Sequence, residues 1–314
     1  MKPLFKWAGG KNKMLKHYID LMPRHITSYC EPFFGGGAMF INIMNKHNPN
    51  HIKINDINHD IMRIYKSIKN NYDEFLSTVN ELEVSYIKLE GPTPDNTKGK
   101  GKDKTHCDRW HFFMDVRNQH AFNYINWSEP KEAATLYFLM KTGFNGIYQL
   151  NKSTNGRYGT PPGLMNEKKE IYDRNVIKWW HNALQNAILT STDWKDAVEE
   201  CHEETFFFFD PPYRQSFADY GNGFTDEQLL DLINFSDKQK YVMLCNRDDD
   251  GWFENNKKRE GVQGRLLIEQ NGIKEEVDFK EGSAIERWGC TLLILGDASW
   301  LRLNIYPPGV PVRP

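Results

Sequence analysis

Four residues in the second half of the chain combine a carboxylate, two prolines and an aromatic ring: Asp210, Pro211, Pro212 and Tyr213. The four phenylalanines at 206–209 precede them and are typical of a strand that is buried on both faces. Asp210 then follows the carboxyl end of that strand, where open α/β sheets bind their ligands. The prolines stiffen the turn and leave its carbonyl groups free to accept hydrogen bonds. These groups are suited to hold a planar, amine-bearing base against a reacting carbon, although a plain turn with an incidental acid is the simpler alternative.

A second candidate site is the glycine run at residues 35–37, which lies between an expected strand and an expected helix. Glycines there allow a ligand to approach the backbone closely. Asp56 ends the next expected strand, 19 residues after Gly37. An acid at this spacing binds ribose hydroxyls in nucleotide-binding βαβ units. Because the G-x-G-x-x-G pattern is absent, the sequence favours an adenosine-containing cofactor without a pyrophosphate over NAD.

The composition is that of an ordinary globular protein, with 39% hydrophobic and 26% charged residues in a chain of 314. The net charge is only −2, but residues 1–60 hold eight Lys or Arg against four Asp or Glu. Residues 98–178 hold fourteen against eight, so a basic face for nucleic acid is expected in the first 180 residues. No run reaches the roughly 18 apolar residues of a membrane span, and we expect no membrane partner.

The five cysteines are scattered, odd in number and without a Cys-x-x-Cys pair, which favours a reducing compartment over disulfides. His106, Cys107 and His111 lack a fourth ligand nearby, so we expect no metal. The N-terminus does not resemble a signal peptide, since lysines interrupt any apolar stretch. We therefore expect a monomeric protein of the cytoplasm, from a bacterium or from a virus or phage that acts in its host cell.

The pattern of apolar residues predicts an α/β fold that a helical insertion interrupts. Strands are expected at residues 28–30, 52–55, 187–190, 205–209, 241–245 and 290–295, and a helix with Thr225 as N-cap at 225–235. Residues 58–143 are expected to be mostly helical, and 144–163 to form a loop or hairpin. We expect a discontinuous catalytic domain at 1–60 and 171–314, and a helical target-recognition domain at 61–170. The loop at 91–106 has no assigned role.

Four motifs in one order resemble those of the Dam-like (class D12) DNA adenine methyltransferase family. Residues 5–11 (FKWAGGK) look like its N-terminal motif, residues 31–37 (EPFFGGG) like its S-adenosylmethionine loop, residues 54–58 (INDIN) like its ribose motif, and residues 210–213 (DPPY) like its catalytic motif. The resemblance implies a Rossmann-like, S-adenosylmethionine-dependent methyltransferase sheet. It also implies these cofactor-binding residues: Trp7, Lys11, Phe33, Phe34, Gly35, Gly37, Asp56 and Asp210. Trp7 as a buried anchor and Lys11 as a charge at a helix start remain alternatives.

The family resemblance further implies a reaction on double-stranded DNA. The exocyclic amine of a flipped adenine would donate hydrogen bonds to Asp210 and to the Pro211 carbonyl, and its ring would stack on Tyr213. Alignment by these groups favours in-line displacement of the methyl group without a covalent intermediate. Residues 141–151 (KTGFNGIYQLN) and 155–163 (NGRYGTPPG) resemble the recognition segment and its hairpin. The expected DNA-binding residues are Lys6, Phe144, Asn145, Gln149, Asn151 and Arg157.

The residues alone leave two alternatives open. One keeps the chemistry but changes the substrate to RNA or to cytosine, and the other is a catalytically silent DNA-binding protein. The recognition hairpin argues against the first, and the intact 210–213 motif with Lys11 argues against the second. Family members that read GATC commonly have Arg where this chain has Gln149, so GATC is not assumed as the target.

Overall fold

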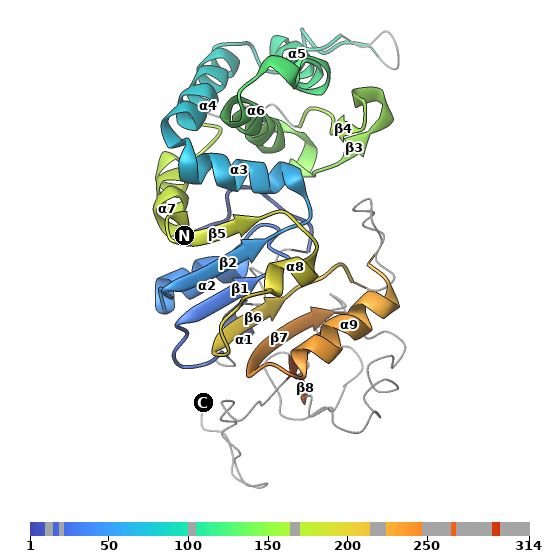
Figure 1. Cartoon of the computed structure of the whole chain (residues 1–314). Coiled ribbons are helices and arrows are strands. Elements are labelled where there is room, and N and C mark those ends of the chain that lie inside the picture. The colour runs from blue at the N-terminus through green and yellow to red at the C-terminus, as the bar shows by residue number, and fades with distance from the viewer. Residues whose placement is uncertain are drawn as a thin grey trace, which may run out of the picture. The chain divides into compact units, whose positions relative to one another are not determined.

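The computed structural model describes residues 1–9, 15–18, 22–99, 105–163, 170–213, 224–246, 265–267 and 291–295 (Figure 1). Contacts divide the chain into two compact units. Unit 1 comprises Met1–Lys11, Phe34–Met44 and Ile52–Ala197, and unit 2 comprises Asn12–Phe33, Asn45–His51 and Val198–Pro314.

Unit 1 is mainly helical. Its larger helices are α2 (Ala38–Lys46), α3 (His59–Asn70), α4 (Tyr72–Ile87), α5 (Asp108–Phe122), α6 (Glu129–Thr142) and α7 (Arg174–Leu184). Its shorter elements are α8 (Trp194–Val198), η4 (Tyr124–Asn126), η5 (Phe144–Gly146) and η6 (Lys152–Thr154). Its strands are β2 (His51–Asn55), β5 (Ala187–Thr190), β3 (Leu150–Asn151) and β4 (Arg157–Tyr158). In Figure 1, α3 lies beside β5, and α4, α5 and α6 stand together with the β3–β4 hairpin.

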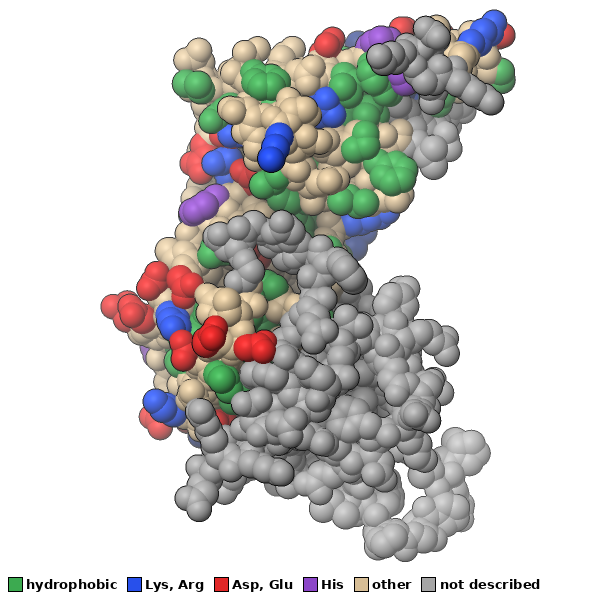
Figure 2. Space-filling model, turned by 90° about the vertical axis from the view of Figure 1, so that its right-hand side faces the viewer, with side chains coloured by type: hydrophobic (Ala, Val, Ile, Leu, Met, Phe, Trp, Pro, Cys, Tyr) green, Lys and Arg blue, Asp and Glu red, His purple; other side chains and the backbone are tan. Residues whose placement is uncertain are grey.

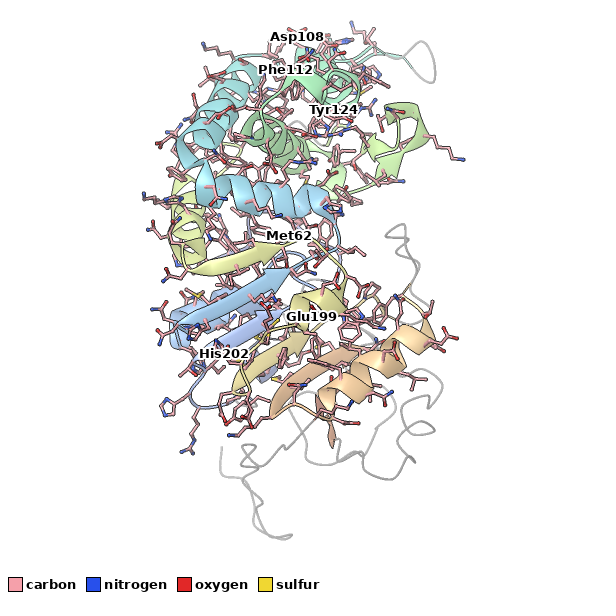
Figure 3. All side chains as sticks on the ribbon, in the orientation of Figure 1. Met62, Asp108, Phe112, Tyr124, Glu199 and His202 are labelled. Carbon is pink, nitrogen blue, oxygen red and sulfur yellow. The ribbon has the colours of Figure 1, made fainter. Side chains whose placement is uncertain are left out.

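Helix α6 lies at the centre of the helical part of unit 1, in contact with α3, α4 and α5. Almost every residue from Pro130 to Met140 is buried, so the helix is covered on all sides. Ser128 begins it as an N-cap that accepts a hydrogen bond from the Lys131 N–H. Helix α3 begins in a similar way, because the Asn58 side chain accepts from the N–H groups of Asp60 and Ile61. Met62, labelled in Figure 3, is one of the residues that α3 buries.

Two pairs of strands place the loops of unit 1. Strands β2 and β5 are parallel, with Ile52 opposite Ala187 and Asn55 opposite Thr190. Strands β3 and β4 are antiparallel and form a separate hairpin, with Asn151 opposite Arg157. Asp56 therefore lies at the carboxyl end of a parallel strand, where a ligand site is expected.

Unit 2 contains the remaining strands and helices. They are α1 (Leu15–Tyr18), β1 (Ser28–Glu31), β6 (Thr205–Phe209), α9 (Asp226–Ser236), β7 (Tyr241–Asn246), β8 (Arg265–Leu267) and β9 (Thr291–Leu295). The strand order in this unit is β1-β6-β7-β9-β8. Strands β1, β6 and β7 are parallel to one another, and β9 runs antiparallel to β7 and to β8.

The core of unit 2 is built around β6, all of whose residues are buried. Phe235 of α9 packs its ring edge-on against Phe207, at 5.4 Å between ring centroids, and also contacts Phe209. Helix α9 begins with a capping box, in which Thr225 and Gln228 exchange side-chain and backbone hydrogen bonds. Burial of both faces of β6 explains why its sequence is a continuous apolar run.

The predicted α/β fold with mostly parallel strands, flanking helices and a helical insertion is confirmed. The expected strands at 187–190 and 205–209, the Thr225 N-cap and the hairpin within 144–163 all occur as predicted. Helix α8 and strand β8 were not expected, because both are too short to show a periodic pattern.

Candidate active site and DNA-recognition hairpin

The glycine loop and the acid at the end of β2 are joined by backbone hydrogen bonds. The Gly35 N–H donates to Oδ2 of Asp56 at 2.8 Å, and the Asn58 N–H donates to Oδ1 at 2.9 Å. Gly35 also accepts a hydrogen bond from the Tyr65 hydroxyl at 3.1 Å. These bonds hold the turn after β2 against the loop that begins α2.

The Asp56 carboxylate keeps acceptor capacity for a ligand. A carboxylate offers about four lone-pair sites, and the bonds from Gly35 and Asn58 account for one on each oxygen. Burial raises the pKa of Asp56 to about 6, and the Asn58 and Gly35 N–H groups oppose that rise. The residue still keeps part of its surface exposed. Asp56 can thus accept hydrogen bonds from vicinal hydroxyl groups, as the ribose assignment requires.

Trp7 lies directly on the glycine loop. A Cβ added at Gly35, where φ is +49°, would be 2.6 Å from Cδ1 of Trp7, and one at Gly36 would be 3.3 Å from its Cβ. The Trp7 ring also contacts the rings of Phe5 and Tyr148, at centroid distances of 6.1 Å and 5.4 Å. Trp7 is half-buried, so it both anchors the loop and keeps part of its ring accessible.

Two other residues expected to bind cofactor lie in the packing around this loop. Phe34 is buried among the rings of Phe40, Tyr65 and Trp180. Gly37 has φ +65°, and a Cβ there would be 2.6 Å from Trp180. Phe34 and Gly37 thus pack against the aromatic core that supports the loop. A direct ligand contact by either residue remains a prediction. Lys11, the remaining predicted residue of the N-terminal motif, lies outside the described residues.

The expected catalytic residues follow β6 in unit 2. The strand ends at Phe209, so Asp210 lies at its carboxyl end, as predicted. Asp210, Pro212 and Tyr213 are partly exposed, whereas Pro211 is buried. Phe33 of the same unit packs edge-on against Phe209, with 6.3 Å between centroids. A carboxylate, a proline carbonyl and a phenol ring thus follow one another at the end of a fully buried strand.

The segment from Thr142 to Gly163 forms a long hairpin. Beyond the β3–β4 pair, the Gly159 N–H donates to the Gln149 carbonyl at 2.7 Å, and the Phe144 N–H donates to the Pro161 carbonyl at 2.8 Å. Asn145 and Asn155 have φ of +53° and +55°, a conformation that Asn tolerates better than most residues. The turns are therefore built from the residue types that first predicted a hairpin here.

Most of the expected DNA-binding side chains of the hairpin are exposed. Phe144, Asn145, Gln149 and Asn151 all reach the surface. Figure 2 looks onto this side of unit 1 and shows hydrophobic side chains at the surface among polar ones. Lys6 is exposed as well, and its Cδ would lie 3.2 Å from a Cβ added at Gly146. Lys6 and the first turn of the hairpin therefore lie together.

Arg157 differs from the other predicted DNA-binding residues, because its guanidinium is engaged within unit 1. It forms an ion pair with Glu132 of α6, which also pairs with Arg63 at 3.0 Å. Its Cζ lies 3.5 Å from the centroid of the Tyr124 ring, which is labelled in Figure 3. The Arg157 side chain is only 16% exposed. A base contact by Arg157 would require this ion pair to open.

Next to Arg157, His120 of α5 is fully buried. Its pKa is lowered to about 4, first because burial disfavours the charged ring and then because Arg157 is positive. His120 is therefore neutral at physiological pH and does not repel the guanidinium. Arg157 of the hairpin thus belongs to a partly buried polar cluster with Glu132 and Arg63, and the neutral imidazole of His120 lies beside it.

Sequence reasoning did not single out Tyr148. Its hydroxyl donates to Oδ2 of Asp60 at 2.7 Å, and its ring contacts Trp7. In the sequence, the one indication of a role for Tyr148 was its position inside the segment that resembles the recognition motif. Among the described residues, no group of His, Cys, Asp and Glu could hold a metal ion, and none of the described helices is long and apolar enough to cross a membrane.

Comparison with known proteins agrees with this geometry. The D12 class N6 adenine-specific DNA methyltransferase family matches residues 7–265. The type II methyltransferase M.MjaIII of Methanocaldococcus jannaschii is 31% identical over 246 residues, which cover 75% of this chain and 79% of the relative. The DNA adenine methylase of Haemophilus influenzae is 26% identical over 298 residues, 90% of this chain and 93% of the relative.

A viral protein is also among the relatives. The type II methyltransferase M.CviBI of Paramecium bursaria Chlorella virus NC1A is 28% identical over 258 residues, 79% of this chain and 84% of the relative. The family match spans both the glycine loop with Asp56 and the Asp210 motif. The predicted resemblance is confirmed, and the chain belongs to the D12 class of N6 adenine-specific DNA methyltransferases.

Proposed function

We propose that this chain transfers the methyl group of S-adenosylmethionine to the N6 amine of an adenine that is flipped out of double-stranded DNA at a short specific site. Family membership supports the reaction and the DNA substrate. The single observation that best supports the cofactor is the Asp56 carboxylate at the end of β2, tied to the glycine loop and with acceptor sites to spare. These acceptor oxygens fit the hydroxyl groups of a ribose, while Trp7 offers a ring face to a base.

Asp210 has the central role in the proposed chemistry. The adenine amine is a weak nucleophile because its lone pair is delocalised into the ring. Hydrogen bonds from this amine to the Asp210 carboxylate and the Pro211 carbonyl favour a pyramidal nitrogen whose lone pair is free to attack. When bound, S-adenosylmethionine supplies a methyl group already activated by its sulfonium. Asp210 also stabilises the positive charge that develops on the nitrogen, and alignment rather than acid–base power sets the rate.

The Tyr213 ring would hold the base in position. An adenine amine is inaccessible inside a duplex, so the base must leave the stack. This unstacking costs a few kcal/mol. A flat ring directly after two prolines offers a stiff surface on which the extruded base stacks. Pro212 fixes the backbone between the carbonyl that accepts from the amine and the ring that stacks.

Residues 61–170 are proposed as the target-recognition domain, with a discontinuous catalytic domain at 1–60 and 171–314. Exposed side chains of the hairpin support this role, since Asn and Gln read adenine edges and an apolar ring such as Phe144 can enter an opened stack. Gln149 leaves the target sequence open, and GATC is not assumed. The proposal includes a monomer that acts in the cytoplasm of a bacterial or virus-infected cell.

One experiment tests the proposal. The chain and its Asp210→Ala variant are expressed in cells without DNA methylation, and modified bases are mapped by single-molecule sequencing. We expect N6-methyladenine in one short motif for the native chain and none for the variant. Glu227→Ala, at an exposed acid of α9 in the same unit, is the matched control and should methylate normally. Methylated cytosine, methylated RNA or near-normal activity of Asp210→Ala would refute the assignment.

A further inference from the structure

A continuous series of hydrogen bonds leads from the glycine loop to the first turn of α3. The N–H groups of Gly35 and Asn58 both donate to Asp56, and the Asn58 side chain accepts from the N–H of Asp60. Asp60 in turn accepts from the Tyr148 hydroxyl through Oδ2 and from Arg63 through Oδ1. All of these residues belong to unit 1, so one set of hydrogen bonds connects the glycine loop, the start of α3 and the hairpin within that unit.

Tyr148 reaches this series from the hairpin by two separate contacts. Its ring lies 5.4 Å from the Trp7 ring, which itself covers Gly35. Its hydroxyl donates to Asp60, 88 residues earlier in the chain. The neighbouring residues Phe144, Ile147 and Leu150 are 45–49% exposed, so Tyr148 is the inward-directed aromatic residue of an otherwise outward-facing stretch. One side chain thus touches the wall of the expected cofactor site and also holds the hairpin.

We propose that Tyr148 is a positioning residue that couples the two substrates of the reaction: through its hydrogen bond to Asp60, cofactor binding at the glycine loop and DNA binding at the hairpin strengthen each other. The inference rests on the proposed function, because it takes Trp7 and Asp56 as cofactor contacts and the hairpin as the DNA reader.

The physical reason is a shared cost of ordering. A cofactor held by Asp56 and Trp7 reduces the conformational freedom of the glycine loop and of the first turn of α3. Because Tyr148 is bonded to Asp60, the hairpin loses conformational freedom as well. DNA then binds a hairpin whose conformational entropy is already reduced, so its affinity rises. Linkage requires the reverse effect of equal size, since DNA on the hairpin must tighten cofactor binding by the same factor.

The hydroxyl of Tyr148 is a stable donor for this role. Burial first, and then the negative charge of Asp60, raise the pKa of Tyr148 well above its usual range, so the phenol keeps its proton at any working pH. Asp60 lies in the first turn of α3, where a carboxylate is favoured by the helix dipole. Arg63, on the same face one turn later, holds the other oxygen at 3.1 Å and so orients the carboxylate toward the hairpin.

The experiment measures cofactor affinity by calorimetry, with and without a cognate DNA duplex. The variants are Tyr148→Phe, which keeps the ring on Trp7 and removes only the hydroxyl, and Tyr172→Phe as the matched control. Tyr172 also donates its hydroxyl within unit 1, to Asn80, and within the described part of the chain it makes no hydrogen bond to the glycine loop or to the hairpin. In the native chain we expect the duplex to tighten cofactor binding by a factor of about 5–150.

In Tyr148→Phe this coupling factor should fall by about tenfold or to unity, the size expected for loss of one hydrogen bond to a charged group. Cofactor affinity without DNA should change little, and Tyr172→Phe should keep the native factor. Asp60→Asn tests the route: combined with Tyr148→Phe, it should lower the factor no further than Tyr148→Phe alone. A merely structural role would instead lower both separate affinities and the melting temperature together.

The possible results distinguish a failure of the coupling by Tyr148 from a failure of the proposed function. Native coupling in Tyr148→Phe overturns the inference and leaves the proposed function intact, and so does a native chain that binds both ligands independently. Additive effects of Tyr148→Phe and Asp60→Asn also overturn it. A native chain that neither binds S-adenosylmethionine nor methylates DNA refutes the proposed function itself, and the inference with it.

Discussion

Gly35 and Asp56 are 21 residues apart in the chain, yet the Gly35 N–H donates to the Asp56 carboxylate at 2.8 Å. The same glycine has a positive φ and lies under the Trp7 ring. Gly35 therefore joins three parts of the expected cofactor site: the N-terminal segment, the glycine loop and the end of β2.

Gly35→Ala should destabilise the glycine loop for two reasons, a steric clash and backbone strain. The new Cβ would meet Trp7 at 2.6 Å, and an L-residue at this φ costs about 1–2 kcal/mol. We expect a loss of unfolding free energy in urea and weaker cofactor binding by calorimetry. Gly156→Ala is the control, because φ is +73° there but, apart from its chain neighbours, no atom of the described residues lies within 4 Å of the new Cβ. Equal effects of the two variants on cofactor affinity would contradict the role of the Trp7 contact.

Asp56→Asn should remove one pH-dependent component of stability. Burial raises the pKa of Asp56 to about 6, against about 3.9 in an unfolded chain. The folded state thus holds this proton more tightly, so the Asp56 contribution to the unfolding free energy is highest below pH ~4. It falls as pH rises toward ~6, by up to about 3 kcal/mol, and is then constant. The difference between native chain and variant should follow this curve in urea titrations at several pH values.

The same ionisation should appear in cofactor binding. An ionised carboxylate accepts hydrogen bonds from ribose hydroxyls better than a protonated one, so affinity should increase as pH rises through about 6 and should stay flat in Asp56→Asn. A native chain whose cofactor affinity is independent of pH between 5 and 7 would argue against Asp56 as the ribose contact.

Glu132→Ala should destabilise unit 1 strongly. Glu132 pairs with Arg63 and Arg157, and its side chain is only 10% exposed. Its loss leaves two guanidinium groups with one acid fewer, and breaking a buried pair in this way costs about 3–5 kcal/mol. Glu204→Ala, which breaks the solvent-exposed pair with Lys240 in unit 2, should change the unfolding free energy far less, because solvent screens an exposed pair. Urea unfolding of both variants checks this order, and similar costs would contradict it.

Gln149→Arg should change the target sequence and not the chemistry. Gln149 is exposed on the hairpin, and Arg bonds O6 and N7 of guanine where Gln suits adenine. We expect a shift toward sites with guanine at one fixed position, worth about 1–3 kcal/mol in discrimination, with constant cofactor affinity. Methylated-site profiles of both proteins on one random-sequence library provide the measurement. Identical profiles at equal rates would show that Gln149 does not contact bases.

Much of the fold and the family could be predicted from short, local patterns. Four phenylalanines followed by Asp210 predict a buried strand and the place of an acid at its end, because burial on both faces requires an apolar run and two prolines stop it. The glycine run and Asp56 indicate a nucleotide site by spacing alone. Asn and Gly at 145–146 and 155–156 indicate turns, because these residues tolerate positive φ.

The partners of individual side chains were decided only by the tertiary structure. Tyr148 and Asp60 are 88 residues apart, and no local period encodes their hydrogen bond. Phe34 belongs to a motif that resembles a cofactor loop, yet it is buried under that loop by Tyr65 and Trp180. Arg157 lies in a hairpin whose sequence is typical of an exposed surface. Its charge is nevertheless paired with Glu132 of helix α6. Such contacts depend on how distant helices pack, which residue type and spacing do not specify.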